Sequence, residues 1–282
     1  MIVSWKAVTH SAIGTRHIAR EMPCQDFGDF QIRDGLVFAA VSDGAGSAKF
    51  SDLGARLAVQ TWIETAMGKL DSMDFSSSTI AEFDFRPLFE EITSEVLERL
   101  TRESESGEYP LRELGCTLLS FIASADWIAA MQIGDGFIVY QAVDSDDYEL
   151  VFRPDKGEFI NETLFVTSRG AIESLQYSFQ TCSPRFICAA TDGLEKVAIS
   201  YQDWTPHRPF FKPFKDCLQL IPEPSEQYQY LQTFLESERL NARTDDDKTL
   251  LLCLADREGV DQESAEHQMS AEHEGAEREG IA

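Results

Sequence analysis

The sequence contains no long hydrophobic run. Nowhere in its 282 residues does a stretch approach the roughly 20 consecutive apolar residues that a helix needs to cross a bilayer. The opening segment, MIVSWKAVTH, also lacks the basic region and apolar run of an export signal. We therefore expect a protein without a membrane segment, located in the cytoplasm. Hydrophobic residues still make up 43% of the chain, which is enough to bury a sizeable core.

Basic residues are scarce. Lys and Arg total 24 against 49 Asp and Glu, and the formal net charge is -25. This charge repels nucleic-acid backbones and anionic membranes, so we expect neither as a partner. Part of the excess lies in residues 256–282, where nine acids and two arginines stand among Ser, Ala and Gly. That composition predicts an acidic, disordered tail after a single domain at residues 1–255.

Several familiar site motifs are missing as well. The glycines form neither the dinucleotide-binding nor the P-loop pattern, and there is no GxSxG nucleophile turn and no HExxH zinc helix. The six cysteines are scattered without CxxC spacing, and several lie in apolar runs such as FICAA and LLLCLA. This placement is typical of reduced core residues, so we expect neither a disulfide framework nor a zinc site.

Apolar runs of strand length dominate what is present. Residues 36–41 form a continuous run, as in a strand buried on both faces, and residues 2–8 alternate. Further strands are expected at 116–123, 127–133, 137–143, 149–153, 163–168, 185–191 and 249–255. The first three of these are separated by the turn groups SAD and GDG, which predicts an antiparallel meander.

Helices are fewer than strands. Apolar spacing predicts helices beginning near Leu53, running from Leu88 to Leu100, and running from Ser225 to Leu240. Either Ser51 or Asp52 can cap the first helix, and a Ser- and Asp-rich connection at 69–84 follows it. The last helix would place Tyr228, Leu231 and Leu235 on its inner face. This order of elements favours two sheets packed face to face with helices outside.

Several apolar strands stop at an acid. LVFAAVSDG ends at Asp43, AAMQIGDG at Asp135 and FICAATDG at Asp192, while DDD at 245–247 stands directly before TLLLCLA. A fifth candidate is Asp26 in PCQD. Strand ends in packed sheets bring distant residues together, and a glycine after the acid permits a sharp turn.

Carboxylates that converge without Lys or Arg partners repel one another and take up protons. A bound cation removes that conflict, and oxygen ligands without nearby His or Cys suit Mg or Mn far better than zinc. The alternative is a β protein with ordinary Asp-Gly hairpin turns. Residues 37–52, VFAAVSDGAGSAKFSD, lead into a helix and offer no return strand, which favours a metal site.

The acids belong to an ordered set of short motifs. The set consists of QD at 25–26, SDGAG at 42–46, GCT at 115–117, GDG at 134–136, TDG at 191–193 and DDKT at 246–249. In order and spacing, over about residues 5–255, it resembles the metal-dependent PP2C-type (PPM) serine/threonine phosphatases, and the bacterial branch in particular. The resemblance implies an α+β fold, an αββα sandwich of two antiparallel β-sheets flanked by helices, with a dinuclear metal centre at one end of the sheets.

The resemblance also implies roles for single residues. Asp43 would bridge two Mg or Mn ions, and the Gly44 carbonyl would be a further ligand. Asp192 and Asp246 match the family's later ligands. These three acids would act through a metal-bound water that attacks phosphorus in line, without a covalent intermediate.

Other positions extend or depart from the family pattern. Asp26 matches the early acid beside the centre, and Asp135 matches a position that in some members helps to hold a third, weaker ion. Gln25 stands where the family often has Glu, which removes a charge. Ala45 stands where many eukaryotic members have His, so a metal-bound water must donate the proton to the leaving group.

The phosphate-binding position is also altered. The family commonly has an Arg five residues before the first Asp, and this chain has Glu21 there. Arg16 or Arg20 in the same loop, GTRHIARE, could replace it as the phosphate clamp. His17 in this loop is either a structural residue or a group that approaches the substrate.

The resemblance implies a protein serine/threonine phosphatase that hydrolyses phosphoserine and phosphothreonine. Its partners would be a phosphorylated protein substrate and a cognate kinase in bacterial signalling, and we expect a monomer. Residues 197–224, rich in aromatics and prolines, look like an irregular insertion where the family places its flap, so they either contact substrate or form a packed loop. The alternative function is a non-catalytic or weakly active module that binds phosphorylated partners, with Gln25 and Glu21 marking a decaying site.

Overall fold

A computed structural model describes residues 3–71, 80, 82–152 and 163–257. Its strands form two antiparallel five-stranded sheets and a short hairpin. In spatial order, the first sheet contains β1 (Val3–Ala12), β12 (Lys248–Arg257), β9 (Pro184–Ala190), β6 (Phe137–Ala142) and β7 (Glu149–Leu150). The second sheet contains β2 (Phe27–Arg33), β3 (Leu36–Ser42), β4 (Leu118–Ala123), β5 (Trp127–Ile133) and β8 (Gln176–Thr181). The hairpin pairs β10 (Ile199–Ser200) with β11 (Thr205–Pro206).

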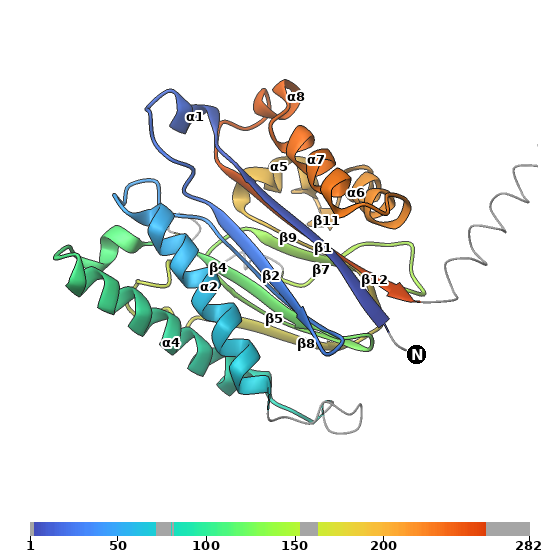
Figure 1. Ribbon diagram of the computed structural model, residues 1–282, viewed down its shortest axis with the longest axis horizontal. Coiled ribbons are helices and arrows are strands. Elements are labelled where there is room, and N and C mark those ends of the chain that lie inside the picture. Colours follow the sequence, from blue (N-terminus) through green and yellow to red (C-terminus); the bar gives the residue numbers. More distant parts are fainter. Residues whose placement is uncertain (1–2, 72–79, 81, 153–162, 258–282) are drawn as a thin grey trace, which may run out of the picture.

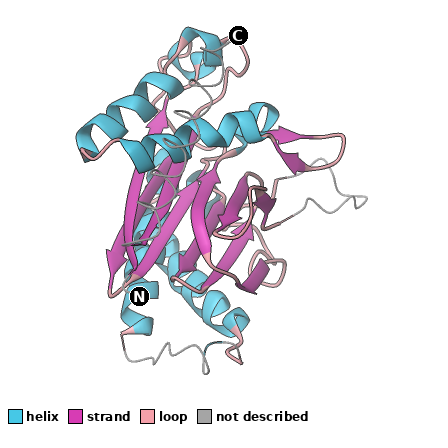
Figure 2. Cartoon of the chain, turned by 90° about the vertical axis from the view of Figure 1, so that its right-hand side faces the viewer, coloured by secondary structure: helices cyan, strands magenta, loops and turns pink. Residues whose placement is uncertain are grey.

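Helices cover the outer face of each sheet, which confirms the predicted αββα sandwich. Helices α2 (Ser51–Leu70) and α4 (Phe85–Ser106) pack on the second sheet, and α6 (Arg208–Leu220) and α7 (Pro224–Leu235) pack on the first (Figure 1). Figure 2 shows helices lying outside the strands at both ends of the stack. Short helical turns complete the description: α1 (Thr15–Ile18), η1 (Leu111–Leu114), η2 (Asp192–Leu194), α5 (Glu195–Ala198) and α8 (Glu238–Asn241). None of the helices in the described part of the chain could span a membrane.

The apolar run at residues 36–41, in β3, is explained by burial on both faces of the strand. Val37, Ala39 and Val41 point into the core between the two sheets. Phe38 and Ala40 point the other way, into the core under α2 and α4. Because successive side chains of a strand alternate between faces and both faces are covered here, residues 36–41 are all apolar, and the buried Ser42 at the end of the strand donates a hydrogen bond to the Thr117 carbonyl oxygen. The prediction of a strand buried on both faces is confirmed.

The predicted meander of three strands is wrong. Strands β4 and β5 pair as expected, but β6 pairs with β9 and lies in the first sheet. Gly134 and Gly136 in the connecting GDG have φ of 94° and 109°, a region that glycine occupies at little cost. A Cβ on Gly134 would lie 2.5 Å from Thr117 Cγ2, and one on Gly136 would lie 2.6 Å from the Ala190 carbonyl oxygen. The turn therefore carries the chain across from one sheet to the other.

The other strand predictions differ in extent. The run at 163–168 forms a loop with turns rather than a strand. In the described part of the expected strand at 149–153, which ends at residue 152, only Glu149–Leu150 forms a strand in the sheet. Strands β2 and β8 were not predicted, because their mostly half-buried, polar-rich sequences lack a clear apolar face. Strand β12 continues to Arg257, past the expected domain boundary, and the rest of the acidic tail lies outside the described residues.

The expected irregular structure at 197–224 is also wrong, because α6 occupies half of it. Phe211, Phe214 and Leu218 of α6 are buried against the first sheet. Pro209 lies in the first turn, where a helical N–H has no partner to lose. Pro213 lies inside the helix and costs it one backbone hydrogen bond, which the burial of its aromatic neighbours offsets.

Helix ends also differ from the sequence prediction. The first helix begins at Ser51, and neither Ser51 nor Asp52 caps it, since Phe50 is the N-cap. It ends at Leu70, and most of the connection at 69–84 lies outside the described residues. The expected single helix at 225–240 is two helices, α7 and α8, and the Ser237 side chain caps α8. Leu231 and Leu235 are buried as predicted, but Tyr228 is 42% exposed.

Candidate metal centre

Three carboxylates that are far apart in the sequence meet at one end of the two sheets. Asp43, Asp135 and Asp192 each offer an oxygen atom, and these oxygens lie within 4.8 Å of one another. Asp43 follows β3 and Asp135 follows β5, both in the second sheet, whereas Asp192 follows β9 in the first. The structure therefore brings together three of the acids at which apolar strands stop.

Asp26, in the segment before β2, is a fourth acid next to this group and acts electrostatically on Asp43. Its Oδ2 accepts a hydrogen bond of 2.6 Å from Thr191 Oγ1, and its Oδ1 is buried without a hydrogen-bond partner among the described residues. Burial raises the pKa of Asp26 to about 7, although the Thr191 hydrogen bond opposes this. Burial, and next the neighbouring Asp26 and Asp192, raise the pKa of Asp43 to about 11. Burial, and next Asp135 and Asp246, raise the pKa of Asp192 to about 6.

Backbone contacts hold Asp43 in place. The Asp43 N–H donates to Thr117 Oγ1 at 2.9 Å, and the Thr117 N–H donates to the Asp43 carbonyl oxygen at 2.8 Å. The next residue, Gly44, donates its N–H to the Gln25 carbonyl oxygen at 3.1 Å. A Cβ on Gly44 would lie 2.7 Å from that oxygen and 2.8 Å from Ser51 Cβ. Only glycine lets the loop after Asp43 approach Gln25 and α2 this closely.

The expectation that the acids lack basic partners is wrong for Asp246. Its Oδ1 accepts a hydrogen bond of 2.6 Å from an Arg16 guanidinium nitrogen, and both side chains are about one-third exposed. Asp246 also acts electrostatically on Asp192, so Arg16 borders the acid group. Arg20, the other candidate, is exposed and forms no ion pair with any described residue.

Asp247, the neighbour of Asp246, belongs to the DDD run noted in the sequence, which gave it no role of its own. Its Oδ1 accepts from the Gly14 N–H at 2.6 Å, and its Oδ2 accepts from the Gln25 N–H at 2.6 Å. Oδ2 also lies 2.8 Å from His17 Nδ1, and Asp247 and His17 are both buried. These contacts tie the loop before β2 to the start of β12. Of the two roles considered for His17, the structure supports the structural one.

We expect the Asp247→Ala substitution to lower the free energy of unfolding by about 3–5 kcal/mol, the usual cost of removing one partner from a buried pair. It would leave two backbone N–H groups and the His17 ring nitrogen without their acceptor. Urea denaturation measures this difference. The matched control is Asp245→Ala, at an exposed neighbour, which should change stability by less than about 0.5 kcal/mol. Equal, small effects at the two positions would contradict the structural role of Asp247.

Glu195 is an acid that sequence reasoning missed. Burial, and next Asp192 and Asp135, raise its pKa to about 7. It begins the short helix α5 directly after η2. The only signal in the sequence was its position three residues after Asp192 in TDGLE.

The chemistry of this group fits a hard cation. The side-chain atoms that could bind a cation here are all oxygens. Three of them, Asp26 Oδ1, Asp135 Oδ1 and Gln25 Oε1, are buried without a hydrogen-bond partner among the described residues. Buried polar atoms usually have partners, so these three oxygens are available to a cation or to its water ligands. Oxygen donors of this kind suit Mg or Mn.

Comparisons with known proteins agree with this chemistry. A family model described as "Protein phosphatase 2C" matches residues 13–236. Serine/threonine-protein phosphatase 3 of Escherichia coli (strain K12) is 34% identical over 265 residues, covering 89% of this chain and 99% of that protein. Among solved structures, the S. agalactiae serine/threonine phosphatase matches with a TM-score of 0.59 at 16% identity, over 90% of this chain and 100% of that one.

A second structural match is the catalytic domain of the serine/threonine protein phosphatase PstP in complex with two manganese ions. It has a TM-score of 0.56 at 14% identity, over 90% of this chain and 100% of that one. At these identities the two structures support the fold alone. The family model and the Escherichia coli relative span most of the sequence, and on that evidence this chain belongs to the protein phosphatase 2C family.

Proposed function

We propose that this protein is a metal-dependent phosphatase that hydrolyses phosphoserine and phosphothreonine in proteins. The observation that carries the proposal is the meeting of Asp43, Asp135 and Asp192 within 4.8 Å, next to a buried Asp26 with an unpartnered oxygen. At neutral pH such a group is stable only if protons or cations neutralise it. A module that merely binds phosphorylated proteins would have no need for this arrangement.

The residues that would hold two Mg or Mn ions are Asp43, the Gly44 carbonyl, Asp192 and Asp246, with Asp26 beside them. Asp135 would contribute to a third, weaker site with Asp192. When bound, such ions would lower the pKa of a coordinated water and neutralise charge on the phosphoryl oxygens.

The surrounding residues orient these acids. Thr191 donates to Asp26, and Thr163 Oγ1 donates to Asp135 Oδ2 at 2.8 Å. Thr117 holds the backbone of Asp43. Ala45 is buried and carries no proton donor, so the proton for the leaving group must come from water in this scheme.

We propose Arg16 rather than Arg20 as the phosphate clamp, because Arg16 reaches Asp246. The Arg16→Ala variant is expected to lower kcat/KM for an aryl phosphate by about 10- to 100-fold, since hydrogen bonds to charged groups contribute about 1.5–3 kcal/mol. Its Mn affinity should be no weaker than that of the parent, because Asp246 loses a competing partner. Steady-state kinetics and Mn titration measure the two effects.

Arg20→Ala is the matched control, and its kcat/KM should stay close to the parent value. A larger loss in Arg20→Ala than in Arg16→Ala would assign the clamp to Arg20. Weaker Mn binding in Arg16→Ala would mean that the Arg16–Asp246 pair supports the metal site instead.

Hydrolysis of p-nitrophenyl phosphate with and without Mn tests the proposal as a whole. Turnover that requires Mn or Mg is expected. Absence of metal-stimulated turnover, together with retained binding of a phosphopeptide, would favour the binding module. We further propose that the catalytic domain, expected at residues 1–255, includes the whole of β12 to Arg257, that it is a monomer in the cytoplasm, and that it opposes a cognate kinase.

A further inference from the structure

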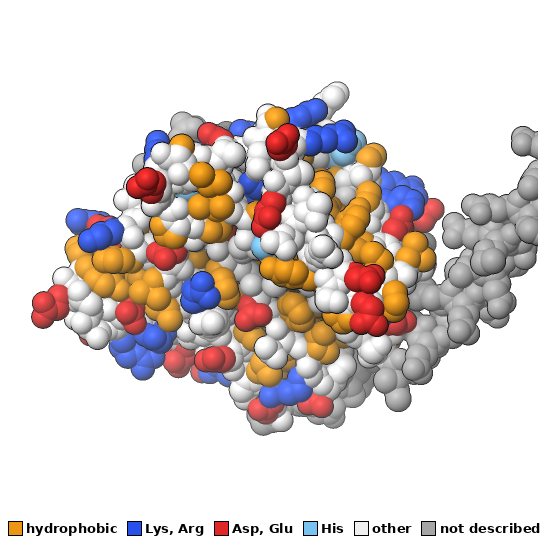
Figure 3. Space-filling model, turned by 45° about the horizontal axis from the view of Figure 1, so that its top comes forward, with side chains coloured by type: hydrophobic (Ala, Val, Ile, Leu, Met, Phe, Trp, Pro, Cys, Tyr) orange, Lys and Arg blue, Asp and Glu red, His pale blue; other side chains and the backbone are white. Residues whose placement is uncertain are grey.

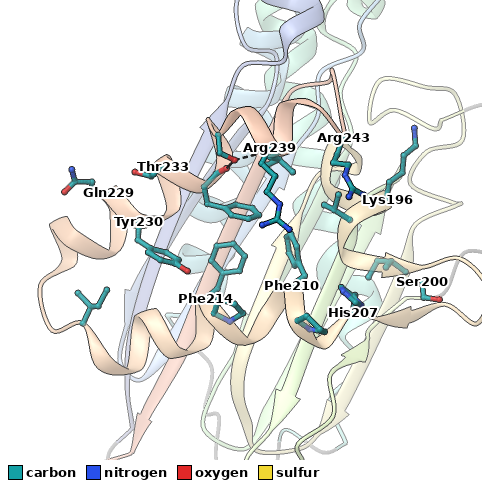
Figure 4. A pocket seen from close by; sticks show the side chains of 18 of the residues that line it. Lys196, Ser200, His207, Phe210, Phe214, Gln229, Tyr230, Thr233, Arg239 and Arg243 are labelled. Atoms are coloured by element: carbon teal, nitrogen blue, oxygen red, sulfur yellow. Dashed lines mark hydrogen bonds between the residues drawn. The ribbon is translucent and has the colours of Figure 1, made fainter.

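An open groove of about 1200 Å³ lies outside the first sheet, among α5, α6, α7 and α8. Aromatic side chains from α6 and α7 line much of it, and Figure 4 shows Phe210, Phe214 and Tyr230 facing the space between the two helices. The Phe214 ring centroid lies 4.9 Å from that of Phe234 and 6.1 Å from that of Tyr230. Tyr230 is 41% exposed. Phe210 and Phe214 are almost fully buried, so the partly exposed rings of Tyr230 and Phe234 are the aromatic groups that a ligand could contact. A concave, largely apolar lining of this kind is typical of a binding site.

The rim of the groove is basic, although the whole chain is acidic. Lys196, Arg239 and Arg243 line it, against a single acid, Glu226. Figure 4 shows the Arg239 side chain extending between the helices above Phe210 and Phe214. On the face drawn in Figure 3, basic side chains gather at the upper edge, in the region of α8. The chain as a whole has 49 acids against 24 basic residues, so the positive charge at the groove is opposite to the net charge of the protein. This difference indicates a partner that is acidic where it contacts the groove.

The groove borders a cleft at the carboxylate centre. A smaller cleft of about 330 Å³ contains Asp192, Glu195 and Asp246 among its walls. Lys196 and Arg243 line both this cleft and the groove. A chain bound with one residue at the acids would therefore meet these two cations on its way to the groove.

We propose that the groove binds the substrate segment next to the phosphorylated residue, and that it selects phosphoproteins with a large apolar side chain on that segment and acidic residues in between. This inference rests on the phosphatase function proposed above. Binding energy gained away from the reacting phosphate can raise kcat/KM, and an aromatic anchor in an apolar pocket supplies such energy. The net charge of -25 would by itself suggest basic targets, so the groove predicts the opposite charge for the residues near the phosphate.

The test uses short phosphothreonine peptides of equal length, in which one Phe moves along an otherwise Ser, Gly and Asp sequence. At one or two spacings on one side of the phosphothreonine, Phe should raise kcat/KM over a Ser control by about tenfold or more, the effect of burying one large apolar side chain. Replacing the intervening Asp by Lys should lower kcat/KM. Equal rates for all spacings would overturn the proposal.

Two tyrosines on α7 provide a matched pair of variants. Tyr230 lines the groove, whereas Tyr228 is similarly exposed but contacts His10 through its hydroxyl at 3.0 Å. Tyr230→Ala should reduce the rate ratio of Phe peptide to Ser peptide towards one, and Tyr228→Ala should leave that ratio as in the parent. Similarly, Arg239→Glu should abolish the preference for Asp over Lys, whereas Arg102→Glu on α4 should not. Unchanged ratios in Tyr230→Ala and Arg239→Glu would overturn the proposal.

Two measurements separate this proposal from the proposed function. If the parent does not hydrolyse p-nitrophenyl phosphate with Mn, the proposed phosphatase function is wrong. Fluorescence anisotropy would still show whether the Phe peptide binds more tightly than the Ser peptide. Turnover of p-nitrophenyl phosphate without any peptide preference would overturn the groove assignment alone. A dimer in sedimentation that Tyr230→Ala abolishes would assign the groove to a second copy of this chain and also overturn the proposal.

Discussion

The Asp43→Asn substitution is expected to reduce Mn-stimulated hydrolysis of p-nitrophenyl phosphate by at least about a hundredfold, since even residues that only support metal ligands cost about 10- to 100-fold when changed. An Asp43 oxygen lies within 4.8 Å of oxygens of Asp135 and Asp192. As a proposed metal ligand, Asp43 should matter more than a residue that only supports a ligand. Steady-state kinetics over a range of Mn concentrations measures the loss.

The same variant allows misfolding to be distinguished from loss of the site. In the absence of metal, burial and three neighbouring acids raise the pKa of Asp43 to about 11, so ionisation of this side chain favours the unfolded state at neutral pH. Asn cannot ionise, so the substitution removes this destabilising contribution. The metal-free Asp43→Asn variant should therefore be at least as stable as the metal-free parent. Asp126→Asn, at an exposed position, is the control for a lost surface charge. Parent-like activity in Asp43→Asn would contradict the proposed role.

Magnesium is expected to raise the melting temperature, and to do so more at pH 8 than at pH 5.5. At a free ion concentration one hundred times Kd, binding to the folded state alone stabilises it by about 2.7 kcal/mol. For a domain of this size that corresponds to a shift of about 5–10 °C. Differential scanning calorimetry with Mg or with chelator measures it.

The pH dependence follows from the raised pKa values of the acids. The pKa of Asp192 is raised to about 6 and that of Asp26 to about 7. Without metal, each therefore contributes stability that is complete below the pKa of the unfolded chain, near 4, and is lost as pH rises through 6 and 7. Cations compete with protons for the same oxygens, so their stabilising effect grows over that range. An equal shift at both pH values, or no shift at all, would contradict the metal site.

Much of the fold could be predicted because its signals are local. An apolar run of strand length, such as that of β3, indicates a strand without reference to the rest of the chain. An acid that follows the run marks the end of the strand in the same way. Asp43, Asp135 and Asp192 could therefore be placed at strand ends before their separation was known. The family resemblance supplied the order of the layers, and the sandwich followed.

Other features depend on contacts between distant segments. Sheet membership of β6 is decided by the two positive φ values around Asp135, and a hydrophobic pattern does not encode them. The prolines at 197–224 suggested irregular structure, but the burial of one apolar face stabilises α6 there in spite of them. The contacts of Arg16 with Asp246 and of His17 with Asp247 each span 230 positions, so no window of sequence could reveal them. The overall acidic charge of the sequence gave no sign of the basic rim formed by Lys196, Arg239 and Arg243.

The pairing of β1 with β12 has a consequence for synthesis of the protein. Strand β1 aligns with β12 from Val3 opposite Arg257 to Ala12 opposite Lys248, and β12 is its only neighbour in the first sheet as described. A growing chain on the ribosome makes β1 before all the other strands described and β12 after them, so β1 has to wait for its partner until residue 257 has been synthesised. Asp246 and Asp247 arrive in the same late segment. The proposed metal centre therefore cannot be complete before β12 has left the ribosome, and phosphatase activity should begin only after that point.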